Sequence, residues 1–422
     1  MRSTRVFTCL ILLAKLELAF GYGFEKAIPF GGKAAGLAGI AAPDIEGADA
    51  LFFNPAGLAA NRIGHSLSLN VSPIATQFKG PVNDDSSQDV SERKILSPGS
   101  LMYSYTPTQK VGYGFGFYIP GGAQTKYADV TFSSPSNATG LEVSTDLTIY
   151  EVAVGAGFTV TDYLKVGMAY RIDLVEGGFK VAQRLGATTL ANLHVEDLTG
   201  LHGHGLKLGA QYILNEKTRL ALTYRSPIEI RVKGNTSGTV YVTGATLPID
   251  ENRITAKTTF PQALQLQASH MVNNRWTLRA GIDWTQYSKV EHVTLDGAIT
   301  RSGGTVISSD APDLEQGWRD QYNVRIASSY FGGKWPLHMG YVWTSQVANN
   351  NWARATFSPP GVGHTLIAGS EAPLGENLSL AMTAEYTWGD GEGNSNPASA
   401  DIRAGTYEVE SIGAHLGLSY LF

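Results

Sequence analysis

Hydrophobic and polar residues alternate along much of the chain after residue 63. In residues 276–285 the apolar side chains occupy every second position: Trp276, Leu278, Ala280, Ile282 and Trp284. Residues 219–225 and 378–388 repeat the pattern. A period of two is typical of β-strands with one apolar face. Past the first 21 residues there is no run of eighteen apolar residues, so the sequence predicts strands and no transmembrane helix.

Two kinds of break separate these strands. Six are short turns, near residues 106–109, 161–162, 215–217, 273–274, 332–333 and 375–377. Seven are long polar stretches interpreted as loops, at about 79–97, 123–145, 185–202, 234–255, 293–316, 346–361 and 389–408. Short turns on one side and long loops on the other are typical of outer-membrane barrels with an even number of strands. The breaks predict an all-β fold, a 14-stranded antiparallel transmembrane β-barrel over residues 63–422.

The final stretch ends on an aromatic residue. Apolar residues in 412–422 again occupy every second position and finish at Tyr420 and Phe422. A C-terminal Phe on the lipid face of a last strand resembles the signal that the bacterial barrel-assembly machinery reads. We therefore expect the bacterial outer membrane as the location and that machinery as a partner.

The first 21 residues have the features of a secretory signal peptide. Two arginines precede an apolar run over residues 6–14, and Ala19 and Gly21 stand at the small-residue positions of a cleavage site. Cys9, the single cysteine, lies in this leader, so the mature chain would contain no disulfide and no cysteine-ligated metal. The leader holds three basic residues and one acidic one, and its removal shifts the formal charge from −5 to −7. That charge argues against nucleic acid as a partner.

Residues 22–62 precede the first clear strand and differ in composition from the rest. They contain a run of glycine and alanine at 31–39 and close on Asn54, Pro55 and Ala56. So many small residues cannot build a core of their own, which indicates that the segment lies inside something larger. A large barrel has a polar lumen that irregular backbone can occupy without facing lipid. We expect residues 22–62 to form a plug (hatch) in the lumen.

Once the apolar side chains are assigned to the lipid face, charged ones point inward. This inward set carries both signs: Glu151, Lys165, Arg171, Asp173, Arg219, Arg225, Glu229, Arg231, Lys233, Arg279, Asp283, Lys289, Arg325 and Glu385. Arg or Lys on the lipid face at the bilayer midplane would cost about 2–4 kcal/mol. The charges either pair with one another and with the plug, or one or two cations meet an anionic ligand headgroup. Arg171 and Arg225 are the candidates for the second role.

The predicted third strand has unusual residues. Inward positions on this strand and the next are small: Gly112, Gly114, Gly116, Gly155 and Gly157. Strand glycines can mark the close approach of another backbone. The third strand then reaches Pro120, Gly121 and Gly122, and proline cannot donate to the ladder, so the pairing is expected to break or bulge there. An ordinary strand end explains these residues about as well as a side exit through the wall.

Three stretches together resemble the FadL/TodX family of outer-membrane transporters for long-chain fatty acids and aromatic hydrocarbons. They are Asn-Pro-Ala-Gly-Leu at 54–58, the third strand at 111–123, and Leu-Thr-Tyr-Arg-Ser at 222–226. The resemblance covers essentially the whole chain after the leader. It implies a fourteen-stranded barrel occluded by an N-terminal plug, and passive transport without a covalent step.

The family takes hydrophobic substrate from a groove between extracellular loops and releases it through a lateral opening where the third strand kinks inward. Carried over by motif, the resemblance implies that the plug motif of Asn54, Pro55 and Ala56 lies against this kink. It places the lateral opening at or near the kink residues, Pro120, Gly121 and Gly122.

Four apolar residues are candidates for contact with a ligand. Leu190 and Leu193 belong to the stretch 185–202, which is unusually apolar for a loop and partly helical in its spacing. Packing of the loop on itself is the alternative explanation. Phe24 and Phe30, at the start of the plug, are candidates for contact with a ligand tail.

The resulting hypothesis is passive outer-membrane transport of hydrophobic compounds, with long-chain fatty acids as the first substrate class. Uptake of aromatic or aliphatic hydrocarbons by the same route is the alternative, and a general porin for polar solutes is a rival that would not need the plug. An outer-membrane hydrolase is a further rival, but no serine falls in a nucleophile motif. We therefore expect no catalytic residue, no cofactor and no metal site. The expected partners are the apolar ligand, outer-membrane lipid and lipopolysaccharide, and the chain is expected to be a monomer.

Overall fold

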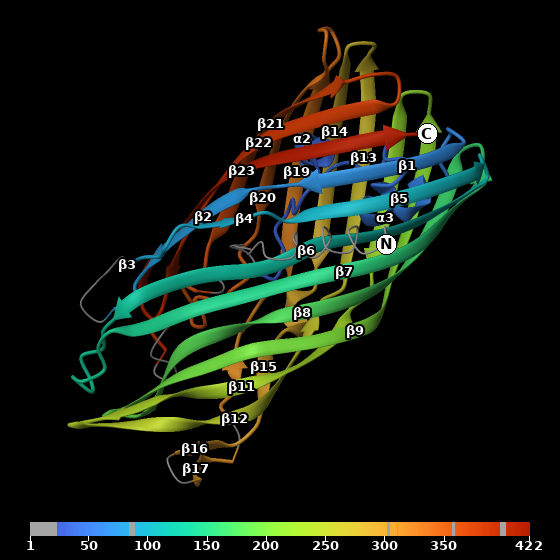
Figure 1. Ribbon diagram of the computed structural model, residues 1–422. Helices are drawn as coiled ribbons and strands as arrows, with labels where there is room; N and C mark the ends of the chain where they lie inside the picture. The colour runs from blue at the N-terminus through green and yellow to red at the C-terminus, as the bar shows by residue number, and fades with distance from the viewer. Residues whose placement is uncertain (1–22, 84–88, 302–303, 310, 357–358, 397–401) are drawn as a thin grey trace, which may run out of the picture.

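The computed structural model describes residues 23–422 apart from 84–88, 302–303, 310, 357–358 and 397–401. These residues form a closed barrel of fourteen antiparallel strands with little helix (Figure 1). The predicted fold class and strand number are confirmed. The signal peptide expected at residues 1–21 lies outside the described residues. In the described part of the chain, no helix has the length and hydropathy needed to cross a membrane.

The strands of the barrel wall follow one another in chain order. They are β1 (Gly64–Val71), β5 (Gly99–Thr108), β6 (Val111–Val130), β7 (Leu141–Thr161), β8 (Leu164–Gly186), β9 (Thr189–Asn215), β10 (Thr218–Arg225), β13 (Ala263–Asn273), β14 (Trp276–Thr285), β19 (Gln321–Tyr330), β20 (Leu337–Thr344), β21 (Val362–Pro373), β22 (Leu378–Gly393) and β23 (Gly405–Leu421). Further strands lie toward the end opposite the short turns: β2 (Ile74–Gly80), β3 (Asp89–Val90), β4 (Lys94–Leu96), β11 (Ile228–Val242), β12 (Ala245–Phe260), β15 (His292–Asp296), β16 (Ile299–Arg301), β17 (Thr305–Ser308) and β18 (Leu314–Glu315).

The first and last strands close the barrel. β1 pairs with β23 in an antiparallel register that runs from Ser66↔Leu421 to Val71↔Leu416. The final residue, Phe422, exchanges two backbone hydrogen bonds with His65, of 2.7 and 2.9 Å. Closing the sheet in this way pairs its first and last strands, which is the condition for a sheet to cross lipid.

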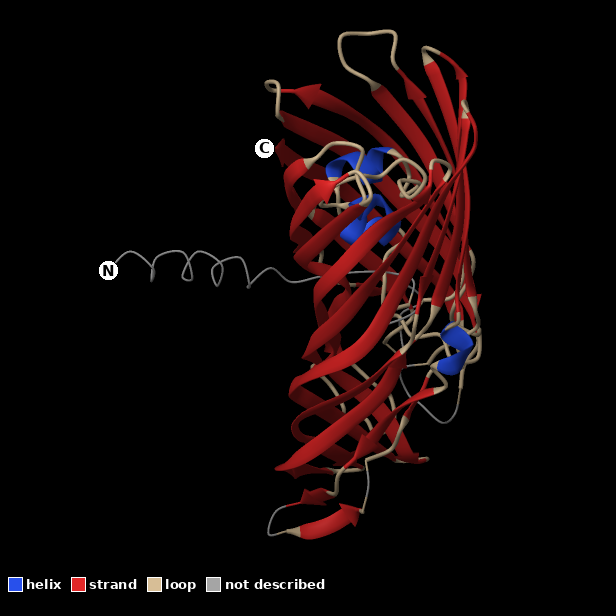
Figure 2. Cartoon of the chain, turned by 90° about the vertical axis from the view of Figure 1, so that its right-hand side faces the viewer, coloured by secondary structure: helices blue, strands red, loops and turns tan. Residues whose placement is uncertain are grey.

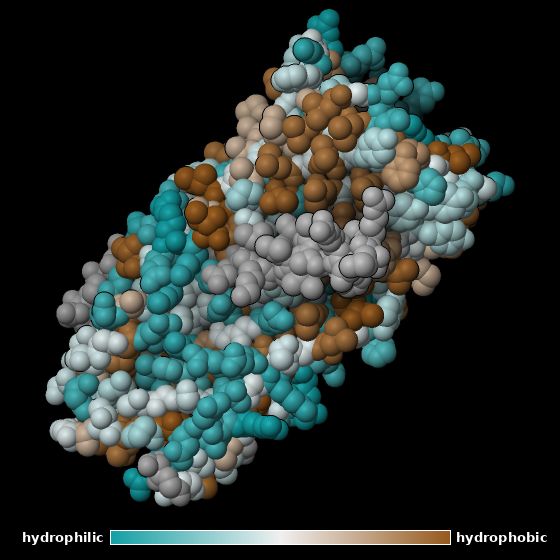
Figure 3. Space-filling model, in the orientation of Figure 1, coloured by the Kyte–Doolittle hydropathy of each residue, from teal (hydrophilic) through white to brown (hydrophobic). Residues whose placement is uncertain are grey.

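The two faces of the wall have different compositions. On β6, Tyr113, Phe115 and Phe117 are exposed on the outer surface, and the glycines between them face the lumen. In Figure 3, hydrophobic side chains gather over the part of the wall that includes β22, β23 and β1, whereas the end of the molecule near β11 and β12 is mostly hydrophilic. The period-two pattern therefore identified the lipid face correctly.

The six short turns lie where they were predicted, but most of the expected long loops are strands. β8 and β9 form a hairpin with a turn at residues 187–188, so the expected loop at 185–202 and its partial helical spacing are wrong. β11 and β12 likewise turn at residues 243–244. These hairpins stand beyond the apolar band, where the outward side chains meet water, so a paired strand there carries polar residues and resembles a loop in sequence.

The break between β10 and β11 corrects part of the inward set. Ile228, Ile230 and Val232 are buried, while the charged residues between them, Glu229, Arg231 and Lys233, are exposed. The inward prediction for these three is wrong because the break at residues 226–227 shifts the alternation by one position, which exchanges the two faces. Lys289 lies exposed in a 3-10 turn, η2 (Tyr287–Lys289), after β14.

Residues 23–62, here called the plug segment, lie inside the barrel. Their helical turns are α2 (Gly32–Gly36), α3 (Ala50–Phe53) and the 3-10 turn η1 (Pro55–Leu58). Figures 1 and 2 show them enclosed by the strands, in the half of the barrel that carries the short turns. Ion pairs tie the segment to the wall: Asp44 with Arg219 and Arg279, and Glu46 with Lys165. The interpretation that inward charges pair with the plug is confirmed for these residues.

The wall is lined with glycine where η1 lies against it. A Cβ atom at Gly157 would stand 2.7 Å from both the Pro55 carbonyl oxygen and the Ala59 nitrogen. Side chains at Gly112, Gly167 and Gly209 would likewise collide with residues 54–59. The close approach of backbones predicted from the strand glycines is therefore present.

We expect Gly157→Val to loosen the plug segment, since a valine would overlap its backbone. Overpacking of this kind typically costs about 1–3 kcal/mol. The midpoint of thermal unfolding of the purified protein in detergent should fall, and leakage of a small sugar into cells should rise. Ala156→Val, on the lipid face of the same strand, is the matched control. Equal behaviour of the two variants would contradict the tight fit.

Candidate functional site

Asn54 fixes the plug segment to β9. Its side-chain oxygen accepts a hydrogen bond from the Ala56 amide (3.1 Å), and its side-chain amide donates to the Ala210 carbonyl (3.0 Å). Asparagine is a favoured N-cap, and Pro55 at the first position of η1 has its backbone already set for a helical turn. The side chain is fully buried. The Asn-Pro-Ala sequence thus builds the turn that lies on the glycine-lined wall.

The wall has a gap beside β6. The β5–β6 ladder stops at the pair Ser100↔Tyr118. On its other edge β6 remains paired with β7, with a bulge between Tyr118 and Gly121. Within the described residues, β4 pairs with β2 and not with β6. The break in pairing expected at Pro120 is therefore present, and its role as an exit stays a prediction.

The start of the plug segment covers this gap from inside. The Gly122 amide donates to the Phe24 carbonyl (2.9 Å), and a side chain at Gly121 would collide with the same carbonyl. Glycine is needed at 121 because the plug backbone passes so close. Ile119, which follows Tyr118 on β6, packs with Ile74 of β2 and Leu96 of β4.

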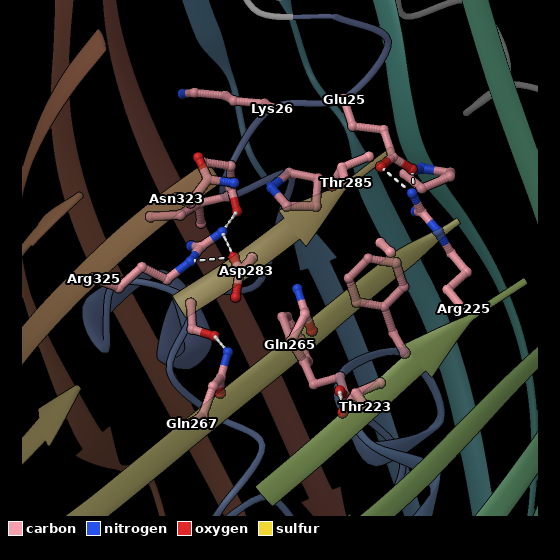
Figure 4. A pocket seen from close by; sticks show the side chains of 18 of the residues that line it. Glu25, Lys26, Thr223, Arg225, Gln265, Gln267, Asp283, Thr285, Asn323 and Arg325 are labelled. Carbon is pink, nitrogen blue, oxygen red and sulfur yellow. Dashed lines mark hydrogen bonds and ion pairs between the residues drawn. The ribbon is translucent and has the colours of Figure 1, made fainter. Parts of the chain in front are cut away.

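Residues 24–26, here called the strap, are tied to opposite sides of the barrel. Glu25 forms a two-pronged ion pair with Arg225 on β10, in which the Arg225 Nη2 to Glu25 Oε2 distance is 2.6 Å. Lys26 pairs with Glu385 on β22. In Figure 4 the Glu25 side chain reaches Arg225 while Lys26 points away from it. Adjacent residues of opposite charge therefore anchor the strap across the lumen.

An aromatic side chain from an outer loop also holds the strap. The Phe24 amide donates to the Tyr287 hydroxyl (3.0 Å), and both rings pack against Trp318. Asp320 positions η2, which carries Tyr287, by accepting from Trp284 Nε1 (2.8 Å) and from the Ser288 amide (3.1 Å). Partial burial raises the pKa of the Asp320 carboxyl, but these hydrogen bonds outweigh it and lower the pKa below the ordinary value.

A polar pocket lies in the lumen beneath the strap (Figure 4). Its charged lining residues are Glu25, Lys26, Lys207, Arg225, Asp283 and Arg325. Arg325 is paired with Asp283 and donates to the carbonyls of Ala27 and Ala38 in the plug segment. Lys207 donates to the Phe52 carbonyl and stands 4.2 Å from the centre of the Phe52 ring. Among the described residues, Lys207 forms no ion pair.

The opposite side of the strap faces a large apolar cluster. It contains Phe24 together with buried residues of β8, β9, β11 and β12, among them Val175, Leu193, Ile228, Ile230, Val232 and Phe260. Residues of the connections before β19 and after β20, including Leu314, Trp318 and Val347, complete it. The interior thus changes from apolar to polar at the strap.

The sequence profile of one protein family, described as outer membrane protein transport protein (OMPP1/FadL/TodX), matches residues 14–420. The chain belongs to this family. The resemblance seen in residues 54–58, 111–123 and 222–226 is confirmed, as is the outer-membrane location.

Curated relatives in the family are distant. The Escherichia coli long-chain fatty acid transport protein is 24% identical over 251 residues, which are 56% of this chain and 52% of that protein. An outer membrane protein of Neisseria meningitidis serogroup B is 23% identical over 395 residues, 84% of this chain and 83% of its own. The match thus spans about half the length of the Escherichia coli relative.

Solved structures of the FadL/TodX family share the fold. The Pseudomonas putida toluene transporter TodX superposes with a TM-score of 0.77 at 16% identity, covering 94% of this chain and 99% of its own. A Pseudomonas aeruginosa FadL homologue gives 0.74 at 15% identity, covering 95% and 100%. At this identity the likeness concerns the fold alone.

The candidate ligand residues of this FadL/TodX member fall in different places. Arg225 and Pro120 line the lumenal pocket. Phe24 and Leu193 belong to the apolar cluster, whereas Leu190 is buried in a separate cluster with Phe78 and Tyr407. Phe30 is buried among Phe52, Phe53 and Tyr118, behind two rings that line the pocket, and does not line it itself. The structure therefore groups only part of the set, and contact with ligand stays a prediction for each.

Arg171, the other cationic candidate, is engaged in the wall. It donates to Glu151 (2.8 Å) and lies 3.7 Å from Asp173, and Tyr118 donates to the same Glu151. All four side chains are buried. This network holds Tyr118 where β6 leaves β5, so Arg171 supports the edge of the gap and does not line the pocket.

Sequence reasoning missed Glu25, Lys26 and Lys207 as site residues. Glu25 and Lys26 form the only adjacent acid–base pair in residues 22–62, which could have marked them as anchors to two walls. Lys207 lies on β9 within the stretch Gly205-Leu206-Lys207-Leu208-Gly209. Its inward direction follows from the outward leucines, so the alternation contained that signal.

We expect Asn54→Ala to destabilise the plug segment without preventing barrel assembly. The variant loses an N-cap, worth about 0.5–2 kcal/mol, and leaves the Ala210 carbonyl without its side-chain donor. Thermal unfolding in detergent should move to lower temperature. Asn61→Ala, at an exposed position of the same segment, should leave the unfolding midpoint in place. A midpoint for Asn54→Ala that matches the wild type would contradict the anchoring role.

Proposed function

We propose that this protein carries long-chain fatty acids across the outer membrane by passive diffusion, from the apolar interior past the strap to the gap beside β6. The observation that carries the proposal is the order of environments inside the barrel. An apolar cluster ends at Phe24, a cation-rich polar pocket begins at Glu25, and the broken ladder lies beside both. A ligand with an apolar tail and an anionic head fits that order.

The lumenal pocket favours a carboxylate over an uncharged hydrocarbon. Lys207 is buried and forms no ion pair with any described residue, and Arg225 already binds a carboxylate. A buried cation gains most from an anionic partner, because the surrounding medium screens it less than water does. Toluene or an alkane would leave this charge as it is.

The gap beside β6 supports sideways release of the ligand through the barrel wall. Irregular backbone is tolerated at membrane depth where the protein itself covers it, and here the strap does so through Phe24. Pro120, Gly121 and Gly122 would form the lateral opening, and the Asn54–Ala56 turn would hold the rest of the plug while the strap moves.

Hydrocarbon uptake by the same route is the second candidate. Solved channels with this fold are described as toluene transporters or monoaromatic hydrocarbon channels, and the apolar cluster would suit such compounds. A general porin is not favoured, because the plug segment lies in the half of the lumen that carries the short turns and most of its residues are buried.

Uptake by cells that lack their own transporter tests the proposal. Cells producing this protein should accumulate labelled long-chain fatty acid well above the empty-vector level, and toluene and a small sugar much less. Preferred toluene uptake would shift the assignment to hydrocarbons. Sugar uptake alone would contradict transport of hydrophobic compounds.

Cross-linking across the gap tests the lateral route. The pair Leu96→Cys with Ile119→Cys places thiols on the two sides, since these side chains pack together. A bifunctional thiol reagent should reduce fatty acid uptake, and the single-cysteine variants should be insensitive to it. The pair Leu101→Cys with Phe117→Cys joins strands that are already paired, so its cross-link should leave uptake intact. Equal inhibition of both pairs would contradict release through the gap.

A further inference from the structure

We propose that Glu25 is a resident substitute for the ligand headgroup, and that it makes passage selective for amphiphiles that carry a carboxylate. The inference rests on the proposed function. Glu25 places a carboxylate on Arg225 at the strap, in the position where the apolar interior meets the polar pocket. A fatty acid presents the same group on a flexible apolar chain, so ligand and Glu25 compete for one guanidinium.

The geometry of the Glu25–Arg225 pair is that of a full carboxylate site. Both oxygens of Glu25 are engaged, one by each terminal nitrogen of Arg225. The Arg225 side chain is only 13% exposed, and that of Glu25 is 24% exposed. A planar guanidinium matches a carboxylate in two-pronged fashion, and an alcohol cannot reproduce that match.

Exchange is balanced in charge only for an anionic ligand. When a ligand carboxylate takes Arg225, the guanidinium keeps a partner, and the released Glu25 can pair with Lys207, which lines the same pocket. An uncharged ligand provides no negative charge to pair with Arg225. Leaving a buried charge unpaired is strongly unfavourable, so Glu25 stays in place and the strap with it.

Displacing Glu25 acts on the gap through its neighbours in the chain. The preceding residue, Phe24, accepts from the Gly122 amide at the wall, and the Glu25 side chain itself lies against Gly121. Loss of the Arg225 anchor therefore loosens the segment that covers the gap. Headgroup recognition and opening of the exit become one event, which a hydrocarbon would not trigger.

The test compares uptake of a labelled long-chain fatty acid with that of the alcohol of the same chain length, in cells lacking their own transporter and at matched surface levels. Glu25→Gln keeps the shape of the side chain and removes its charge. We expect alcohol uptake to rise and the acid-to-alcohol ratio to fall roughly ten- to a hundredfold, the range for one charge-assisted interaction. Glu25→Asp, which keeps the carboxylate, should retain most of the selectivity.

Glu46→Gln is the matched control, because it breaks another ion pair between plug and wall, with Lys165, outside the pocket. Its acid-to-alcohol ratio should equal that of the wild type. Arg225→Gln removes the same anchor together with the carboxylate site, so it should raise alcohol uptake and make acid and alcohol uptake equal, which gives a second measurement if Glu25→Gln fails to reach the surface.

An unchanged ratio in Glu25→Gln, or loss of acid uptake without any gain for the alcohol, would overturn the inference. Either result leaves the proposed function standing as long as the wild type takes up fatty acid. Failure of the proposed function has a different signature, namely wild-type acid uptake no higher than in empty-vector cells.

Discussion

Every backbone amide and carbonyl at membrane depth needs a partner, and the rest of this structure follows from that constraint. The barrel meets it by closing β1 on β23, down to the terminal Phe422. The strand pairing is broken at one edge of β6, where the ladder to β5 stops. There the plug segment supplies a partner, as the Phe24 carbonyl accepts from Gly122. A wall that can open thus depends on a lumenal chain that can take the place of a strand.

Two kinds of contact hold the plug segment: close backbone packing and ion pairs. Its turn at residues 54–58 rests on glycine-lined wall, where backbone meets backbone and few side chains intervene. Its beginning is held by Glu25 and Lys26, whose partners stand on β10 and β22. Contacts of the first kind depend on close packing and tolerate little displacement. Those of the second kind can exchange partners, which suits the part that lies at the pocket.

The sequence predicted the features that alternation and turn chemistry control. Strand number, lipid face, the short turns and the break at Pro120 all follow from local patterns. The failures have physical causes. Beyond the membrane both the paired strand and the loop are polar on the outside, so β8 and β9 were interpreted as a loop. A one-residue shift at 226–227 moved Glu229 to the surface; Pro227 marks a break there, but the sequence does not tell which face of the next strand turns inward. The Glu25–Arg225 pair joins residues 200 positions apart, which a single sequence does not specify.

The uneven attachment of the plug segment has a consequence for the size of the moving part. Residues 54–58 are locked to the wall, while the strap ends a few residues before Gly31, whose φ of 101° lies in a region that glycine adopts readily. Since Ile28 and Phe30 are fully buried between the strap and Gly31, the part that opens locally would be the strap alone, while the rest of the segment stays folded. Local openings of this kind lie at the low end of the stability range within one protein. The barrel would then pass its cargo without ever becoming an open pore, and the permeability barrier of the membrane would be preserved during transport.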